Sequence, residues 1–183
     1  MRIALGAGHN PPDYGRVNEQ KHLAEYIEAC KITALLKDAL WLGKFEIVGF
    51  CGRLKEKVNK INKSRADLAL EIHLNGSDNI NAKGSEFFYY PTDGSEALAR
   101  AIEHSFRDVL SIPVRGSFVG NLRRDTKNPI CYILRKTRCP CVIVESLFIT
   151  NPKEAEMLAD GIIQRKIALA IAVGVNAYVK ENK

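Results

Sequence analysis

The sequence predicts an α/β fold with a mixed, mostly parallel sheet that is flanked by helices on both faces. Segments with strand-like and helix-like spacing of apolar residues alternate along the chain. In addition, residues 141–148 (CVIVESLF) are apolar on both sides, which is typical of a central strand covered by helices. The length of 183 residues suits one domain, so we expect a single unit over residues 1–183.

The first half of the chain is expected to contain short strands and longer helices. Apolar residues at helical spacing, among them Leu23, Ile27 and Cys30, predict a helix over residues 19–41, and Gly43 lies near its end. The expected order is a strand at 2–7, a turn-rich loop at 10–15, this helix, a strand at 45–50, a basic helix at 52–65 and a strand over 66–75 that ends before Gly76.

The second half continues the alternation. Residues 84–91 are rich in aromatic side chains, as strands often are, and Pro152 suits the first turn of a helix. The expected elements are a strand at 84–91, a helix at 94–110, a loop at 111–129, a short edge strand at 132–134, the central strand at 141–148, a helix that begins after Asn151 and a closing helix at 161–179.

Composition and charge limit the classes of function. The hydrophobic fraction of 46% is ordinary for a globular protein, and no run of about eighteen uncharged apolar residues predicts a membrane span. A net charge of +6 favours an anionic partner, such as nucleic acid, a membrane surface or an acidic cell-wall polymer. Because no nucleic-acid-binding module accompanies the basic residues, nucleic acid is not expected. The sequence does not indicate the oligomeric state.

The cysteines and the N-terminus bear on the compartment. Five cysteines without paired CxxC motifs favour free thiols in a reducing compartment. The apolar stretch of residues 3–7 is too short for the core of a signal peptide. We therefore expect synthesis in the cytoplasm.

The strand at 66–75 carries the first candidate functional residue. Successive side chains of a strand point to opposite faces, so Leu68, Leu70, Ile72 and Leu74 share one face. Glu71, His73 and Asn75 share the other face. We expect further polar groups to converge near His73. Glu71 is either an outer partner of His73 or the partner of a lysine, and the sequence leaves both open.

Three candidate residues lie at or near the carboxyl ends of expected strands, where ligand sites of α/β sheets are usually found: His9, His73 and Glu145. Two histidines and a carboxylate are usual protein ligands of a catalytic zinc ion, and a further carboxylate serves as the base. A single histidine at a strand end is often only hydrogen-bonded. Glu145 is the stronger signal, because a buried carboxylate needs a metal, a cation or a raised pKa.

Four motifs in order point to one family: GHNPPDYG at residues 8–15, INKSRADLALEIHLN at 61–75, GSEFFY at 84–89 and PCVIVESLFITN at 140–151. The series resembles the zinc-dependent N-acetylmuramoyl-L-alanine amidases of the amidase-3 family, which includes bacterial autolysins and catalytic domains of phage endolysins. The match covers roughly residues 1–175. It implies a twisted, mixed sheet of about six strands.

The resemblance also implies the site and the reaction. His9, His73 and a glutamate at the start of the first helix would bind Zn²⁺, and Glu145 would be the catalytic carboxylate. For the helical glutamate we favour Glu25, with Glu19 as the alternative. The implied substrate is peptidoglycan, cleaved at the amide between N-acetylmuramic acid and the L-alanine of the stem peptide. The family often has a small residue where this chain has Glu71, which leaves substrate preference open.

Other functions stay open at this point. A related zinc amidase could act on soluble muropeptides during recycling, and a wall-binding module could have lost catalysis. A nucleic-acid-binding protein is favoured only by the net charge. If the amidase interpretation holds, the expected setting is a protein made in the cytoplasm that acts on the wall after release, as an endolysin, a lysin of sporulation or an autolysin.

Overall fold

A computed structural model gives the structure of the chain and describes residues 1–92, 94–110, 112–120 and 129–182. The strands are β1 (Arg2–Ala7), β2 (Val17–Asn18), β3 (Leu23–Ala24), β4 (Glu46–Gly49), β5 (Leu68–Asn75), β6 (Ser85–Tyr89), β7 (Val114–Val119) and β8 (Cys141–Phe148). The helices are α1 (Glu25–Leu42), α2 (Leu54–Ser64), α3 (Ser95–Val109), α4 (Pro129–Lys136), α5 (Pro152–Ala159) and α6 (Gly161–Glu181).

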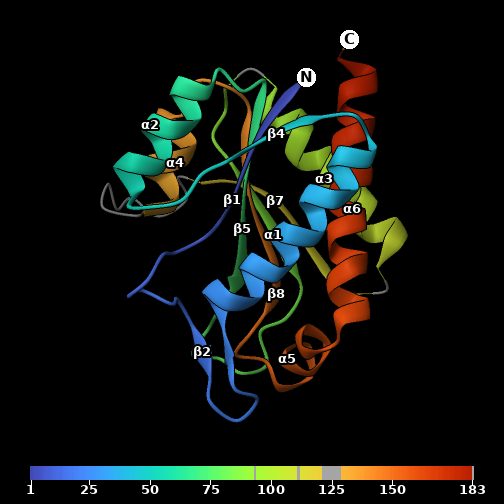
Figure 1. Cartoon of the computed structure of the whole chain (residues 1–183). Helices are drawn as coiled ribbons and strands as arrows, with labels where there is room; N and C mark the ends of the chain where they lie inside the picture. The colour runs from blue at the N-terminus through green and yellow to red at the C-terminus, as the bar shows by residue number, and fades with distance from the viewer. Residues whose placement is uncertain (93, 111, 121–128, 183) are drawn as a thin grey trace.

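A six-stranded sheet in the order β4-β1-β5-β8-β6-β7 forms the centre of the molecule (Figure 1). All its strand pairs are parallel except β6 and β8, which are antiparallel. This arrangement confirms the predicted α/β class with a mixed, mostly parallel sheet. The parallel strands β1, β5 and β8 are neighbours, so their carboxyl ends lie together at one edge.

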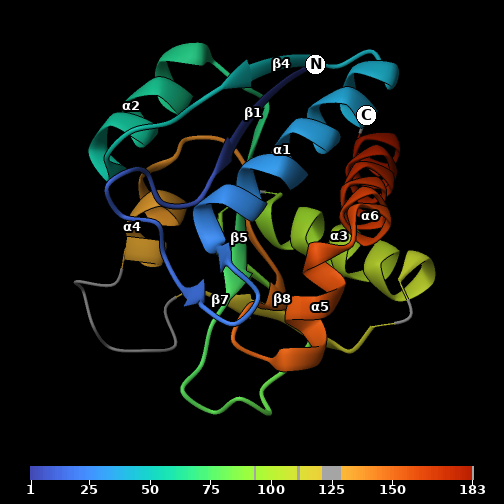
Figure 2. The same cartoon turned by 60° about the horizontal axis from the view of Figure 1, so that its bottom comes forward.

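Helices cover both faces of the sheet, as predicted, and divide the core in two. Helices α1, α3 and α6 lie on one face, and α2 and α4 lie on the other (Figures 1 and 2). Strand β5 serves both layers: Leu68, Leu70 and Ile72 belong to the larger apolar cluster, and Ala69 belongs to the smaller one. Further along the face of Ala69, towards the carboxyl end, the side chains become polar.

Helix α6 is long and apolar enough, with a mean hydropathy of 1.4, to cross a membrane by length and composition alone. Of that stretch, 56% is buried inside the fold, where α6 packs against α1 and α3. Core helices commonly have these properties, so the finding is weak support for a membrane span.

The predicted helix over residues 19–41 is wrong at its start. Helix α1 begins at Glu25, because the preceding residues form the antiparallel hairpin β2–β3. The Glu25 backbone N–H bonds to the carbonyl of Arg16 across the base of this hairpin. Leu23 is buried in the core, but it belongs to strand β3. Its spacing from Ile27 and Cys30 is the same as on the apolar face of a helix, and the helix was therefore expected to begin too early.

Two predictions near the second edge of the sheet are also wrong. The loop expected at residues 111–129 contains β7, an edge strand that pairs with β6, although residues 111 and 121–128 lie outside the described part. The edge strand expected at 132–134 is part of helix α4. A run of three apolar residues is too short to separate helical from strand spacing. In the structure, Ile133 and Leu134 are both buried against the sheet.

Close packing of α6 on α3 yields a first prediction. A Cβ atom at Gly174 would lie 2.5 Å from the Cα of Ile102 and 2.8 Å from the carbonyl oxygen of Ala101. Gly174→Val should therefore lower the free energy of unfolding by about 1–3 kcal/mol, measured by urea denaturation. Gly161→Ala is the matched control, because no atom lies within 4 Å of a Cβ there. Equal stability of the two variants would contradict the observed packing.

Candidate metal centre and active site

Two histidines and one glutamate converge at the carboxyl edge of the sheet. His9 follows β1, His73 lies near the end of β5, and Glu25 is the first residue of α1. One ligand atom of each lies within 4.8 Å of those of the other two. Glu25 Oε1 is 2.9 Å from His73 Nδ1 and 3.1 Å from His9 Nε2. The three side chains thus face a common point.

The environment keeps Glu25 ionised. Burial opposes its ionisation, but the hydrogen bonds from His73 and His9 prevail and lower the pKa of Glu25 to about 2. Its second oxygen, Oε2, accepts a hydrogen bond of 3.0 Å from the backbone N–H of Arg16. The base of the β2–β3 hairpin therefore fixes this carboxylate in place.

Glycines allow the ligand residues to approach one another. A Cβ atom at Gly8 would overlap the ring of His73. At Gly15, where φ is +69°, a Cβ would overlap the Glu25 carboxylate and the ring of His9. Glycine adopts positive φ far more readily than residues with a Cβ atom. The two glycines of the GHNPPDYG segment are thus required by the site itself.

Each histidine is held by a second carboxylate on its other ring nitrogen. Asp13 Oδ2 lies 2.9 Å from His9 Nδ1. Glu71 Oε2 lies 3.4 Å from His73 Nε2, and Glu71 Oε1 accepts a hydrogen bond of 2.6 Å from Lys57 Nζ. Both alternatives left open for Glu71 are therefore correct at once. With these partners, His9 Nε2 and His73 Nδ1 are directed towards the shared centre.

These contacts change the basicity of the rings. Burial lowers the pKa of His73, but hydrogen bonds to Glu25 and Glu71 outweigh it and raise the pKa well above its usual range. The hydrogen bond to Glu25 likewise raises the pKa of His9, against the opposing effect of burial. Both rings therefore lie in an environment that favours positive charge.

Glu145 lies beside this group and differs from the other carboxylates. It is opposite His73 in the β5–β8 register, with 4.0 Å between Glu145 Oε1 and His73 Nδ1. It is 6% exposed, and its Oε2 is a buried atom without a hydrogen-bond partner in the described part of the chain. Burial raises its pKa to about 7, despite the opposing charge of His73.

A polar cluster lies beyond Glu145 on the neighbouring strands. Glu86 of β6 is opposite Glu145 in register, and its Oε2 accepts a 2.7 Å hydrogen bond from the Asn75 side chain. Its Oε1 lies 2.6 Å from Nε of Arg115 on β7. The Arg115 guanidinium also lies 5.3 Å from the ring centre of Phe148, in a cation–π arrangement.

The residues present fit a catalytic metal. Two imidazole nitrogens and one carboxylate oxygen come from three separate elements, and each histidine carries an outer carboxylate, as metal-bound histidines usually do. The structure thus brings His9, Glu25, His73 and Glu145 together. Glu19 is exposed in the turn between β2 and β3 and is not part of the group.

Sequence reasoning missed three members of the site. Asp13 lies in the GHNPPDYG segment, and the signal for it is a carboxylate four residues after a candidate ligand. Glu86 lies in the GSEFFY segment. Arg115 lies in the segment expected to be a loop, and nothing local to the sequence marks it.

Comparison with known sequences places this site in context. A family model described as N-acetylmuramoyl-L-alanine amidase (Amidase_3) matches residues 3–177. The amidase LytC of Bacillus subtilis is 33% identical over 130 residues, which are 69% of this chain and 24% of LytC. The germination-specific N-acetylmuramoyl-L-alanine amidase of the same organism is 29% identical, and the alignment covers 70% of this chain and 51% of that protein. The chain thus spans about a quarter to a half of these relatives.

Solved structures have the same architecture. An N-acetylmuramoyl-L-alanine amidase from Clostridium difficile 630 has a TM-score of 0.88 at 25% identity and covers 100% of this chain and 98% of its own. The catalytic domain of CwlV, an amidase from Bacillus (Paenibacillus) polymyxa var. colistinus, has a TM-score of 0.86 at 25% identity, with 98% of each chain covered. The family model, the relatives and the fold agree, and this chain belongs to the amidase-3 family of N-acetylmuramoyl-L-alanine amidases.

Proposed function

We propose that this protein hydrolyses the amide bond between N-acetylmuramic acid and L-alanine in peptidoglycan. The observation that carries the proposal is a group of three converging residues that could hold a metal ion, with a separate buried carboxylate, Glu145, directly beside it. Membership of the amidase-3 family supplies the substrate. A wall-binding module without catalysis would not need this second carboxylate, and the proposal therefore favours an enzyme.

His9, Glu25 and His73 would hold the metal, which we propose to be zinc. A zinc ion bound there would polarise the scissile carbonyl and lower the pKa of a water molecule. Asp13 and Glu71 keep the two rings oriented, so that His9 Nε2 and His73 Nδ1 face the position of Glu25 Oε1, where the ion would be held. Lys57 in turn balances the charge of Glu71.

Glu145 performs the proton transfers. Its carboxylate, whose Oε1 lies 4.0 Å from His73 Nδ1, accepts a proton from the water that attacks the carbonyl carbon. The same carboxyl group then donates this proton to the nitrogen of the departing alanine as the C–N bond breaks. The products are a muramoyl carboxylic acid and a peptide with a free N-terminal amine. Burial raises the pKa of Glu145, which helps the carboxyl group to hold the proton between the two transfers.

The setting in the cell stays a prediction. We propose that the protein is made in the cytoplasm and reaches the wall after release, and fractionation of the producing cells would test this. Activity on intact peptidoglycan, compared with soluble muropeptides, would separate wall lysis from recycling.

Loss of the proposed base should abolish turnover. Glu145→Gln retains the shape of the side chain but cannot accept a proton, so hydrolysis of purified peptidoglycan should fall by about 10²–10⁴-fold. The rate is measured as new alanine N-termini released. Zinc content and unfolding temperature should stay close to those of the parent, because Glu145 is not among the three converging groups. Retained hydrolysis in this variant would refute the role of Glu145.

Glu25 and Glu19 give a direct test of the ligand set. Glu25→Ala removes one of three converging ligands, and bound zinc should drop well below one per chain by elemental analysis. Glu19→Ala is the matched control, since that side chain is exposed on the hairpin and should leave the stoichiometry unchanged. Loss of metal in the Glu19 variant alone would overturn the assignment.

Asp13 should act on metal affinity without damage to the fold. Its side chain is 71% exposed, so Asp13→Asn should fold normally while the hold on His9 Nδ1 is weakened. We expect zinc affinity to fall about tenfold in competition with a chelator. Asp38→Asn, on the exposed surface of α1, is the control and should bind zinc like the parent. Equal affinity of both variants would mean that Asp13 does not orient the ligand.

A further inference from the structure

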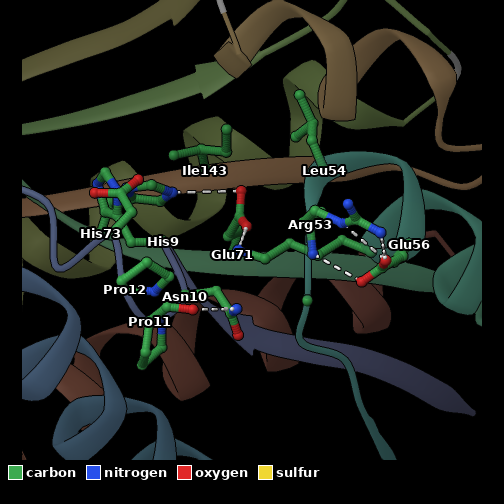
Figure 3. A pocket seen from close by; sticks show the side chains of 13 residues that line it. His9, Asn10, Pro11, Pro12, Arg53, Leu54, Glu56, Glu71, His73 and Ile143 are labelled. Atoms are coloured by element: carbon green, nitrogen blue, oxygen red, sulfur yellow. Dashed lines mark hydrogen bonds and ion pairs between the residues drawn. The ribbon is translucent and has the colours of Figure 1, made fainter.

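A pocket of about 660 Å³ opens from one side of the metal-binding group. His9 and His73 form one end of this pocket, the first turn of α2 forms the other, and Glu71 lies between them (Figure 3). Its size exceeds what a zinc ion and one water molecule need. Part of the substrate beyond the scissile amide could therefore enter it.

The walls of this pocket are mixed in character. Pro11 and Pro12 lie on one side, and Leu54 and Ile143 lie on the opposite side (Figure 3). Asn10 and the ion pair between Arg53 and Glu56 add polar groups, with 2.9 Å between Arg53 Nη2 and Glu56 Oε1. Apolar walls with a few hydrogen-bonding groups suit a neutral, amphipathic ligand such as an N-acetylated sugar.

The opposite side of the metal-binding group differs in charge and position. In the strand order, β8 lies between β5 and β6, so Glu145 separates His73 from Glu86 and Arg115. The Arg115 side chain is 44% exposed, so its cation is accessible to solvent. Although Arg115 Nε is paired with Glu86, this side has a partly exposed guanidinium group that a carboxylate of a ligand can contact. None of Glu145, Glu86 and Arg115 lines the pocket.

The proton transfer fixes which part of the substrate lies on which side. Glu145 must reach the nitrogen of the departing alanine, so the peptide leaves the scissile carbon on the side of Glu145. The acyl substituent of the same carbon then points the opposite way, over β5 and β1. The pocket is at that position.

We propose that the pocket between residues 10–12 and the first turn of α2 is the subsite for the N-acetylmuramoyl sugar, with the stem peptide crossing β6 and β7 past Arg115. This inference rests on the proposed amidase activity. It assigns Leu54 and Arg53 as residues that recognise the sugar. Arg115 would face a carboxylate of the peptide.

Two soluble substrates separate the two sides. N-acetylmuramoyl-L-alanyl-D-isoglutamine contains the sugar, and (R)-lactoyl-L-alanyl-D-isoglutamine has the same scissile amide without it. Cleavage by the zinc-loaded protein is followed as released alanine amine, with enzyme in excess so that slow reactions are measured. The unmodified protein should cleave the sugar-bearing compound at least about tenfold faster.

Leu54→Trp fills the pocket and should slow cleavage of the sugar-bearing compound about tenfold, with little change for the lactoyl compound. Arg53→Ala, whose parent side chain is 88% exposed, should shift the preference in the same direction without risk to the core. Leu42→Trp, at an exposed position on α1, is the matched control and should change neither rate. Arg115→Gln should slow both compounds by the same factor, since both contain the peptide.

The results distinguish failure of this inference from failure of the proposed function. If intact peptidoglycan releases no alanine amine, the amidase proposal itself fails. If peptidoglycan is cleaved but the parent shows no preference for the sugar-bearing compound, the subsite is refuted. Equal slowing of both compounds by Leu54→Trp and by Arg53→Ala, at unchanged unfolding temperature, also refutes it. If Arg115→Gln slows the sugar-bearing compound alone, the sugar lies on the Arg115 side, and the proposed placement of the substrate is refuted.

Discussion

The burial of three carboxylates at one edge of the sheet is the constraint on which the site depends. Glu25, Glu71 and Glu145 are 3%, 3% and 6% exposed. An ionised carboxylate is strongly destabilised away from water unless a cation or several hydrogen bonds compensate for the lost hydration. The buried ammonium group of Lys57 contacts Glu71 and compensates for that charge. The remaining negative charge is met by imidazoles whose pKa values are raised, as at His73. A divalent cation bound to the same imidazoles would provide the compensation more fully.

The fold makes this burial possible because the two faces of strand β5 have different surroundings. One face of β5 is apolar and covered by α1, and the other turns from apolar to polar at Glu71. The loops at the carboxyl edge are tied together as well. Asn18 in the hairpin donates a hydrogen bond of 2.8 Å to the carbonyl of Ile149 after β8, and the backbone N–H of Ser77 bonds to Thr150 Oγ1. The hairpin that positions Glu25 is thus itself tied to the segment after β8.

Features that depend on local sequence patterns could be predicted from the sequence, and features that depend on contacts between distant segments could not. Strand β5 and the central strand β8 were predictable because alternation and double-sided burial are local patterns. The hairpin before α1 was not, because Leu23 is equally apolar in a helix or a strand and only long-range contacts decide between them. Strand β7 exists through its pairing with β6, since residues 114–119 have no strong local pattern. At the site, residue types were predictable but partners were not: Glu71 meets His73 and Lys57 only after the chain folds.

The same residue type serves different purposes in this site because of its neighbours. Burial opposes ionisation of Glu71, but His73 and Lys57 outweigh burial and lower its pKa, so it stays ionised and can hold the His73 ring. Glu145 contacts no lysine or arginine among the described residues, and the charges of Glu25 and Glu86 add to the effect of burial on its pKa. It is therefore the carboxyl group that changes protonation most easily near neutral pH. A dication at His73 would favour its ionised form, which is the form that accepts a proton from water. The different environments thus give the two carboxylates different roles: Glu71 holds the His73 ring, and Glu145 transfers the proton.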